Sequence, residues 1–290
     1  MNSEELQILM IQKVPSMPNK AKRVAEYLLA NMREAAFRSI RDVADELKVS
    51  KAQMVRVARM LGFGGYAELK DCLQNAILEQ VNPVAMLAKS VDVQDEIPKT
   101  ILQMEHANLN DTWSQLESEK TVRFCDLVSN ADHSCCLGWG ISSLVTELLY
   151  MRLSVLGLPT SLCKRGSLAL VEQTRYLKEG NVLLICELPS YAIDVTLAAE
   201  HAHQKGCKII TITDSAAAPI CRFADLSFYV SASSPTFGSS IIAPLFLAHI
   251  LTSNLAITMG DAAKQALQEQ TEFLHDERTF HPVFGLKYKK

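Results

Sequence analysis

Apolar residues between positions 18 and 80 recur every three or four residues, which is the spacing of helices that bury one face. No stretch of this region alternates apolar and polar residues in the manner of a strand. A first helix is expected after Pro18. The clearest pattern spans residues 51–61, where four positions at helical spacing are apolar: Met54, Val57, Ala58 and Leu61. The first 80 residues are therefore predicted to form an all-α domain.

Two short helices of this domain, residues 40–47 and 51–61, are separated by only three residues. Ser50 stands where its hydroxyl would accept a backbone N–H of the second helix, and Gly62 stands where a helix commonly ends. Small Ala44 would let the two helices cross closely. Two helices joined by such a turn predict a helix-turn-helix motif, whose second helix enters the major groove of DNA.

From residue 132 onward the pattern changes, because short apolar runs alternate with amphipathic ones. The strands are expected at 134–137, 160–163, 182–186, 208–213 and 226–230, with helices near 142–157, 167–178, 192–205, 215–223 and 239–258. This alternation predicts a doubly wound α/β domain with a five-stranded parallel sheet. In such sheets a ligand binds beyond the carboxyl ends of the strands, where the strand order reverses.

The chain of 290 residues is long enough for two domains. We expect a helix-turn-helix domain in 1–80, a linker in 81–110, a ligand-sensing and dimerisation domain in 111–265 and a C-terminal tail in 266–290. The start of the linker, 81–98, is acidic and contains prolines at both ends, and a helix near 99–117 is expected to lead into the second domain.

The net charge of −3 hides a difference between the two parts of the chain. Residues 19–70 contain 11 Lys and Arg against 6 Asp and Glu, whereas residues 81–290 contain 17 against 22. This difference favours a polyanionic partner for the N-terminal domain only. The apolar runs are interrupted before 18 residues and the N-terminus lacks a signal-peptide core. A cytoplasmic protein without a membrane segment is therefore expected. Its cysteines, such as Cys135, Cys136 and Cys186, are expected to be buried and reduced.

The outward face of residues 51–61 carries the candidate DNA contacts. Arg and Lys pair with guanine and Gln pairs with adenine in the major groove, so the candidates nearest base edges are Ser50, Lys51, Gln53 and Arg56. The phosphate-contact candidates are Lys20, Lys22, Arg23, Lys48 and Arg59. The alternative is a solvated charged face on an ordinary helical domain.

Residues 38–73 resemble the DNA-binding domain of the RpiR/MurR family. The matching positions are Ser50, Arg56, Leu61, Gly62, Phe63, Gly65, Tyr66, Glu68, Leu69 and Lys70. The family usually has Thr in place of Gln53 and an aromatic residue in place of Val57. The resemblance implies that the chain binds operator DNA, and these two departures concern operator preference.

The loop after the first predicted strand, residues 138–143, is Gly-Trp-Gly-Ile-Ser-Ser. Glycines let a backbone approach an anion, and the helix N-terminus that follows offers free N–H groups. The loop also resembles a dinucleotide fingerprint, but Lys164 and Arg165 stand where the second strand of such a fold carries an acidic residue. The arrangement is similar to the sugar isomerase (SIS) domain, which implies a phosphosugar-binding loop at Gly138, Gly140 and Ser142. The ligand-binding candidates are Gly138, Gly140, Ser142, Ser143, Ser190 and Tyr191.

One segment departs from the SIS pattern. The family has Ser-x-Ser-Gly-x-Thr after the third strand, and residues 187–192 are Glu-Leu-Pro-Ser-Tyr-Ala. A carboxylate at Glu187 would repel a phosphate if it faced the pocket. The alternatives are a different ligand, a different use of Ser190 and Tyr191, or a domain that only dimerises.

Together these features predict a transcription regulator, more commonly a repressor in such families, that controls metabolic genes. Its expected partners are a double-stranded DNA operator, a small-molecule effector (an anionic metabolite or phosphosugar) and further copies of the chain in a homodimer or homotetramer. No catalytic residue, metal or cofactor is expected, and His201 and His203 are too far apart around a helix to share one ion. The alternative is a sugar-phosphate isomerase with a helical extension, with Glu187 or Glu147 as its base.

Overall fold

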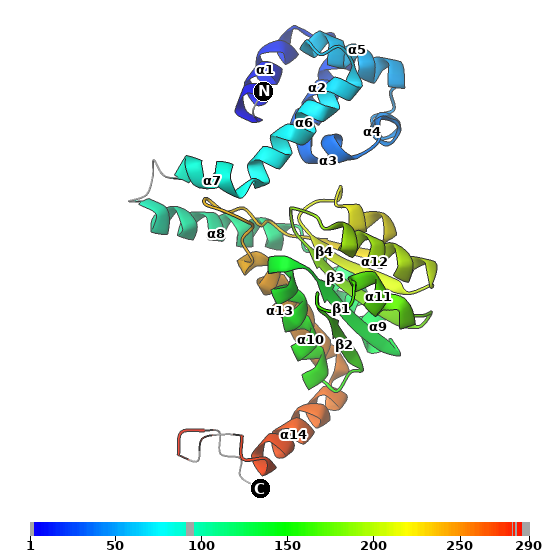
Figure 1. Ribbon diagram of the computed structural model, residues 1–290, viewed down its shortest axis with the longest axis vertical. Helices are drawn as coiled ribbons and strands as arrows, with labels where there is room; N and C mark the ends of the chain where they lie inside the picture. Colours follow the sequence, from blue (N-terminus) through cyan, green and yellow to red (C-terminus); the bar gives the residue numbers. More distant parts are fainter. Residues whose placement is uncertain (1–2, 91–95, 280, 282, 286–290) are drawn as a thin grey trace.

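The computed structural model describes residues 3–90, 96–279, 281 and 283–285. The N-terminal part is helical and lies at one end of the molecule, and the C-terminal part contains the sheet (Figure 1). The helices of the first part are α1 (Ser3–Lys13), α2 (Asn19–Ala30), α3 (Met32–Phe37), α4 (Ile40–Glu46), α5 (Lys51–Leu61) and α6 (Tyr66–Val81). A single apolar core joins them, and it includes Leu6, Met10, Val24, Leu28, Val43, Met54, Leu61 and Leu69.

The helix-turn-helix prediction is confirmed, and its capping residues explain the boundaries. The Ser50 hydroxyl accepts the N–H of Gln53 at the start of α5, and the Ser39 hydroxyl accepts the N–H of Asp42 at the start of α4. Gly62 ends α5 with φ of +104°, a conformation that L side chains rarely adopt. A Cβ at Gly62 would also lie 2.9 Å from Lys13 Nζ.

Helices α7 (Pro83–Ser90), α8 (Ile97–Ser114) and α9 (Ser118–Ser129) follow α6. The expected linker, 81–110, is therefore largely helical where the structure describes it, and the helix expected near 99–117 begins and ends two or three residues earlier. Part of the expected linker, 91–95, lies outside the described residues. Figure 1 shows α8 lying between the helical domain and the sheet.

The sheet consists of β1 (His133–Gly138), β2 (Thr160–Cys163), β3 (Asn181–Glu187), β4 (Lys208–Thr213) and β5 (Leu226–Tyr229). All pairings are parallel and the strand order is β2-β1-β3-β4-β5, so the expected doubly wound α/β fold is confirmed. Helices α9, α10 (Ser143–Val155) and α13 (Ile242–Met259) share one core with the sheet. Helices α11 (Leu170–Gln173) and α12 (Ile193–Gln204) share the core on the other face. The order reverses between β1 and β3, which places the ligand-binding position of such folds at the loops after these two strands.

Helix α13 corrects the expectation that apolar runs are too short to span a membrane. Its 18 residues carry no charge and have a mean hydropathy of 1.6, so by length and composition alone it would be able to cross a bilayer. One face of α13 is instead buried in the C-terminal domain, through Ala243, Pro244, Leu247, Ala248, Leu251, Thr252 and Leu255. A long apolar helix of this kind is also found in the cores of globular domains.

Helix α14 (Asp261–Asp276) follows α13, so the first part of the expected 266–290 tail is helical. The three C-terminal lysines, Lys287, Lys289 and Lys290, lie outside the described residues. The cysteines are free thiols, as expected, and Cys135, Cys136 and Cys186 are buried in the sheet.

Candidate functional site

The exposed face of α5 carries the residues expected to contact DNA. Met54, Val57, Ala58 and Leu61 are fully buried, which turns Lys51, Gln53 and Arg56 to the other side of the helix. Lys51 and Arg56 are exposed, and neither forms a hydrogen bond or ion pair with the described residues. Because none of the described residues holds these two cations, both side chains are available to a groove.

A basic hollow lies beside the first turn of α5. Its volume is about 580 Å³, and its lining residues come from the start of α2 and from the turn between α4 and α5: Asn19, Lys20, Arg23, Lys48, Val49, Ser50 and Gln53. Lys48 takes a positive φ of 54°, which is uncommon for a residue with a side chain and marks the tight turn. The structure thus brings together five of the DNA-contact candidates: Lys20, Arg23, Lys48, Ser50 and Gln53.

Three of the phosphate-contact candidates make contacts within the chain. The Arg23 guanidinium donates to the carbonyl of Leu47, which ties α2 to the end of α4. Arg59 Nε donates to the carbonyl of Gly64 at 3.3 Å, and Lys22 lies 3.8 Å from Glu26. These bonds orient the three cations without burying them, so each keeps N–H groups for a phosphate.

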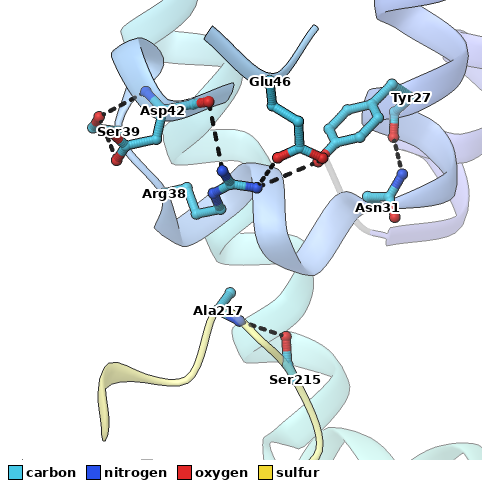
Figure 2. A network of polar contacts seen from close by, with 8 residues as sticks. All are labelled: Tyr27, Asn31, Arg38, Ser39, Asp42, Glu46, Ser215 and Ala217. Carbon is cyan, nitrogen blue, oxygen red and sulfur yellow. Dashed lines mark hydrogen bonds and ion pairs between the residues drawn. The ribbon is translucent and has the colours of Figure 1, made fainter. Parts of the chain in front are cut away.

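A polar network fixes α4 against α2 (Figure 2). Arg38 pairs with Glu46, which also accepts a 2.9 Å hydrogen bond from the Tyr27 hydroxyl. The bonds from Arg38 and Tyr27 hold the pKa of Glu46 below its usual value. Sequence analysis missed this network, because its three members are separated by 8 to 19 positions and lie on different elements. The network joins α2 to α4, the first helix of the helix-turn-helix motif.

Two substitutions separate the capping role of Ser50 from its proposed DNA contact. Ser50→Ala removes the acceptor of the Gln53 N–H, so we expect it to lower the free energy of unfolding of the N-terminal domain by about 1 kcal/mol. Ser50→Asp keeps an acceptor at this position but adds a negative charge, so we expect near wild-type stability with weaker DNA binding. Urea unfolding and fluorescence anisotropy with labelled duplex measure the two effects. Equal stability of the two variants would contradict the capping role.

The second candidate site is a crevice where the sheet order reverses. Its volume is about 100 Å³, and it lies between the loops that follow β1 and β3: Trp139, Gly140, Ile141, Ser142, Glu187, Leu188, Pro189, Ser190 and Ala192. Three of the predicted ligand residues, Gly140, Ser142 and Ser190, line it. Gly138 and Ser143 are their neighbours in the chain but do not line it.

Close packing explains the first glycine of the loop after β1. A Cβ at Gly138 would lie 2.8 Å from Thr146 Oγ1 and 2.9 Å from the Ser142 carbonyl oxygen. The Ser142 hydroxyl accepts the Leu188 N–H at 3.1 Å, and the Ser143 hydroxyl donates to the Gly140 carbonyl at 2.7 Å. These hydroxyls therefore join the loop to itself and to the loop after β3.

Glu187 is the charged group of the crevice. It is 3% exposed, and its Oε1 accepts the Ala192 N–H at 2.8 Å. Its Oε2 is buried and has no hydrogen-bond partner among the described residues. Burial raises the pKa of Glu187 to about 7, because the ionised carboxylate has lost its water. The other carboxylate considered as a base, Glu147, pairs with Lys164 at 2.9 Å.

A larger cavity of about 520 Å³ adjoins the crevice through Pro189 and Ser190. Its wall combines the loop after β5 with α7 and α8, and its lining includes Pro83, Met86, Met104, Asp214, Ser231, Ser233, Ser234 and Ser239. This volume falls in the range of small-molecule sites. Sequence analysis missed the cavity, because the serines after β5 match no motif and the opposite wall comes from the linker.

Helix α8 is joined to the loop after β5 by hydrogen bonds of two buried side chains, Asn108 and Thr112. Asn108 donates to the carbonyl of Ser233 at 2.8 Å and accepts from the Ser231 hydroxyl at 2.9 Å. The Thr112 hydroxyl accepts the Ser231 N–H at 2.9 Å. This wall of the larger cavity is therefore held by specific polar contacts.

Tyr191 extends from the crevice loop toward the N-terminal domain. Its hydroxyl donates to Asp214 at 2.8 Å, and its ring meets Phe37 at the end of α3 edge-on, with 6.4 Å between centroids. Tyr191 does not line the crevice, in which it was expected to contact the ligand. Its position links the loop after β3 to the helix that precedes the helix-turn-helix motif.

Comparison with known proteins agrees with this geometry. Residues 5–80 match the family model of a helix-turn-helix domain of the rpiR family, and residues 127–254 match that of the SIS domain. The chain is similar to the Vibrio vulnificus NanR protein complexed with ManNAc-6P, with 22% identity and a TM-score of 0.61 over 93% of this chain and 98% of that one. It is also similar to the sugar isomerase domain of an RpiR transcription factor from Sphaerobacter thermophilus, with 22% identity and a TM-score of 0.58 over 61% of this chain and 99% of that one. These likenesses show a shared fold.

Proposed function

The chain belongs to the rpiR family of helix-turn-helix regulators with a SIS domain, and from this premise we propose that it binds operator DNA through α5 and that a carbohydrate-type metabolite bound in the SIS domain controls this binding. The observation that carries the proposal is the face of α5, where Lys51 and Arg56 are exposed beside the basic hollow. We propose that the protein is cytoplasmic and represses metabolic genes.

The DNA geometry follows from the helix-turn-helix plan. The N-terminal residues of α5 would reach base edges, and Lys20 and Lys48 at the basic hollow would contact phosphates on either side of the groove. Two copies of the chain would place two α5 helices on half-sites about one helical turn of DNA apart. We therefore propose a homodimer or a dimer of dimers as the DNA-binding form.

The effector is proposed to bind where the loops after β1 and β3 meet the larger cavity. A sugar phosphate is the class that the SIS fold favours, and the NanR protein with the same fold was solved with ManNAc-6P. The volume of about 520 Å³ is sufficient for such a molecule. A thermal-shift screen of sugars and sugar phosphates tests this, because a bound ligand raises the melting temperature by mass action.

The experiment that tests DNA binding uses duplexes from the chromosomal neighbourhood of the gene. We expect tight binding to one of them, with affinity that falls steeply as salt rises because phosphate contacts release counterions. The absence of salt-sensitive binding with or without metabolites would contradict the proposal.

The raised pKa of Glu187 favours one alternative, a sugar-phosphate isomerase that uses this carboxylate as its base. The crevice of about 100 Å³ has room beside the carboxylate for only one end of a sugar, and the alternative base Glu147 is paired with Lys164. Turnover of phosphosugars by the purified protein would favour the enzyme.

The contact between Phe37 and Tyr191 offers a route from effector to DNA. We expect Phe37→Ala to bring the ratio of DNA affinities with and without effector several-fold closer to one, because the link to the ligand-binding loop is lost. Anisotropy titrations with the compound found in the screen measure the ratio. Phe273→Ala on the exposed side of α14 is the control. A full response in Phe37→Ala would show that coupling takes another route.

A further inference from the structure

The carboxylate of Glu187 lies at the N-terminus of α12, where a parallel α/β fold most readily binds an anion. The N-terminus of a helix attracts negative charge through free N–H groups and the helix dipole, and this one lies at the reversal point of the strand order. Glu187 Oε1 already accepts the N–H of Ala192, which is the N-cap residue of α12. The chain therefore places a carboxyl group at this position itself, and this group is an anion above its pKa of about 7.

The lining of the crevice holds no positive charge that would balance a second anion. No Lys or Arg is among the described residues that line the crevice. Asp194 adds a further carboxylate in the first turn of α12. A phosphate entering the crevice would meet the Glu187 carboxylate with no cation in the lining to offset it. Arg165 lies outside the lining, over the Trp139 ring at 5.6 Å from its centroid.

The other oxygen of the same carboxyl group, Oε2, indicates that a ligand binds here. Glu187 lines the crevice and is only 3% exposed. Its Oε2 has no hydrogen-bond partner among the described residues. An unsatisfied buried acceptor is costly, more so when it is charged. A donor arriving from the crevice would remove that cost.

We propose that Glu187 is a built-in anion at the N-terminus of α12, which excludes a phosphate there and accepts a hydrogen bond from a hydroxyl or ammonium group of the effector. The inference rests on the proposed function, because it assigns one end of the same effector. The rest of a polyhydroxylated molecule would lie in the adjoining cavity, whose wall presents Ser231, Ser233, Ser234 and Ser239. The effector class is a sugar or amino sugar whose phosphate, if it has one, lies away from α12.

The exclusion of phosphate is tested with inorganic phosphate as the probe. Thermal melts of the full chain are recorded at pH 8 against chloride of matched ionic strength, for wild type, Glu187→Ala and Glu187→Met. Glu187→Ala vacates the anion position, and Glu187→Met fills it with an uncharged side chain of similar length. We expect phosphate to raise the melting temperature of Glu187→Ala by about 3 °C more than that of wild type or Glu187→Met.

Equal phosphate shifts in the three proteins would overturn the exclusion of phosphate. If Glu187→Ala does not fold, Glu187→Ser provides the vacated position. This measurement contains no DNA, so its failure is distinct from failure of the proposed function, which is read from duplex binding.

Acceptance of a donor is tested with glucosamine and the variant Glu187→Gln. With the amide oxygen on the Ala192 N–H, the amide nitrogen faces the crevice and presents a donor in place of an acceptor. We expect glucosamine to raise the melting temperature of wild type. For the same rise, Glu187→Gln should require at least a tenfold higher concentration of glucosamine. Equal responses of the two proteins, the absence of any response included, would overturn this part of the proposal.

Discussion

Arg56→Ala is expected to weaken binding of the operator duplex about 10- to 100-fold, because a bidentate Arg–guanine pair contributes about 1–3 kcal/mol of discrimination. Arg56 lies on the exposed face of α5, six residues after the N-cap Ser50, and makes no hydrogen bond or ion pair within the described part of the chain. Its removal should therefore leave the fold intact. The loss should be smaller for a non-specific duplex, which the protein holds by phosphate contacts.

The measurement is a pair of anisotropy titrations, with operator and with scrambled duplex, at several salt concentrations. Lys48→Ala should instead weaken both duplexes alike and reduce the salt slope by about one. Arg175→Ala is the matched control, since Arg175 is an exposed arginine of the C-terminal domain that pairs with Glu172. Wild-type operator binding by Arg56→Ala would show that α5 is not the recognition helix.

Glu187→Gln is expected to raise the free energy of unfolding of the C-terminal domain at pH 8 by about 3 kcal/mol. This value follows from the pKa of Glu187, which folding raises from 4.5 to about 7. The folded protein binds this proton more tightly than the unfolded chain, so the stability that it confers is full below about pH 4.5 and is lost as pH rises through about 7. The two groups that interact electrostatically with Glu187, the thiols of Cys186 and Cys221, have pKa values raised by burial and are neutral in this range. Gln keeps the acceptor for Ala192 and carries no charge at any pH.

Urea unfolding of wild type and Glu187→Gln between pH 5 and 8 checks this prediction. The two curves should converge toward pH 5 and separate toward pH 8. Asp225→Asn is a control of opposite sign: burial alone would raise the pKa of Asp225, but hydrogen bonds from Lys208 and the Ile209 N–H lower it overall. Asp225→Asn should therefore destabilise the protein near neutral pH. A constant difference between wild type and Glu187→Gln across this range would contradict the buried charge.

Local signals allowed much of this fold to be predicted from sequence. The limits of α5 follow from Ser50 and Gly62, which act through hydrogen bonds and backbone conformation within a few residues. The strands β2 and β4 have the predicted limits, because short apolar runs bounded by polar residues mark buried parallel strands. Helix α1 was missed, since its burial of Leu6 and Met10 depends on contacts with distant helices.

The candidate site was less predictable, for a physical reason. The loop residues Gly140, Ser142 and Ser190 carry a sequence pattern, and the structure brings them to one crevice. Whether Glu187 faced that crevice depended on the path of the chain after β3, which the residues do not reveal on their own. The ring of Tyr191, a ligand-binding candidate, contacts Phe37, a residue 154 positions earlier that belongs to another domain, and the sequence pattern gave no sign of this contact.

The hydrogen bonds of Asn108 have a consequence for where the chain should be cut. The family match to the SIS domain begins at residue 127, but α8 ends at Ser114 and contributes the buried amide that holds Ser231 and Ser233. A fragment starting at 127 would lose these hydrogen bonds, expose Ser231 and Ser233, and lose one wall of the larger cavity. A fragment starting before Ile97 would retain these hydrogen bonds and the α8 part of the wall, so we expect the autonomous folding unit to begin about thirty residues upstream of the homology boundary.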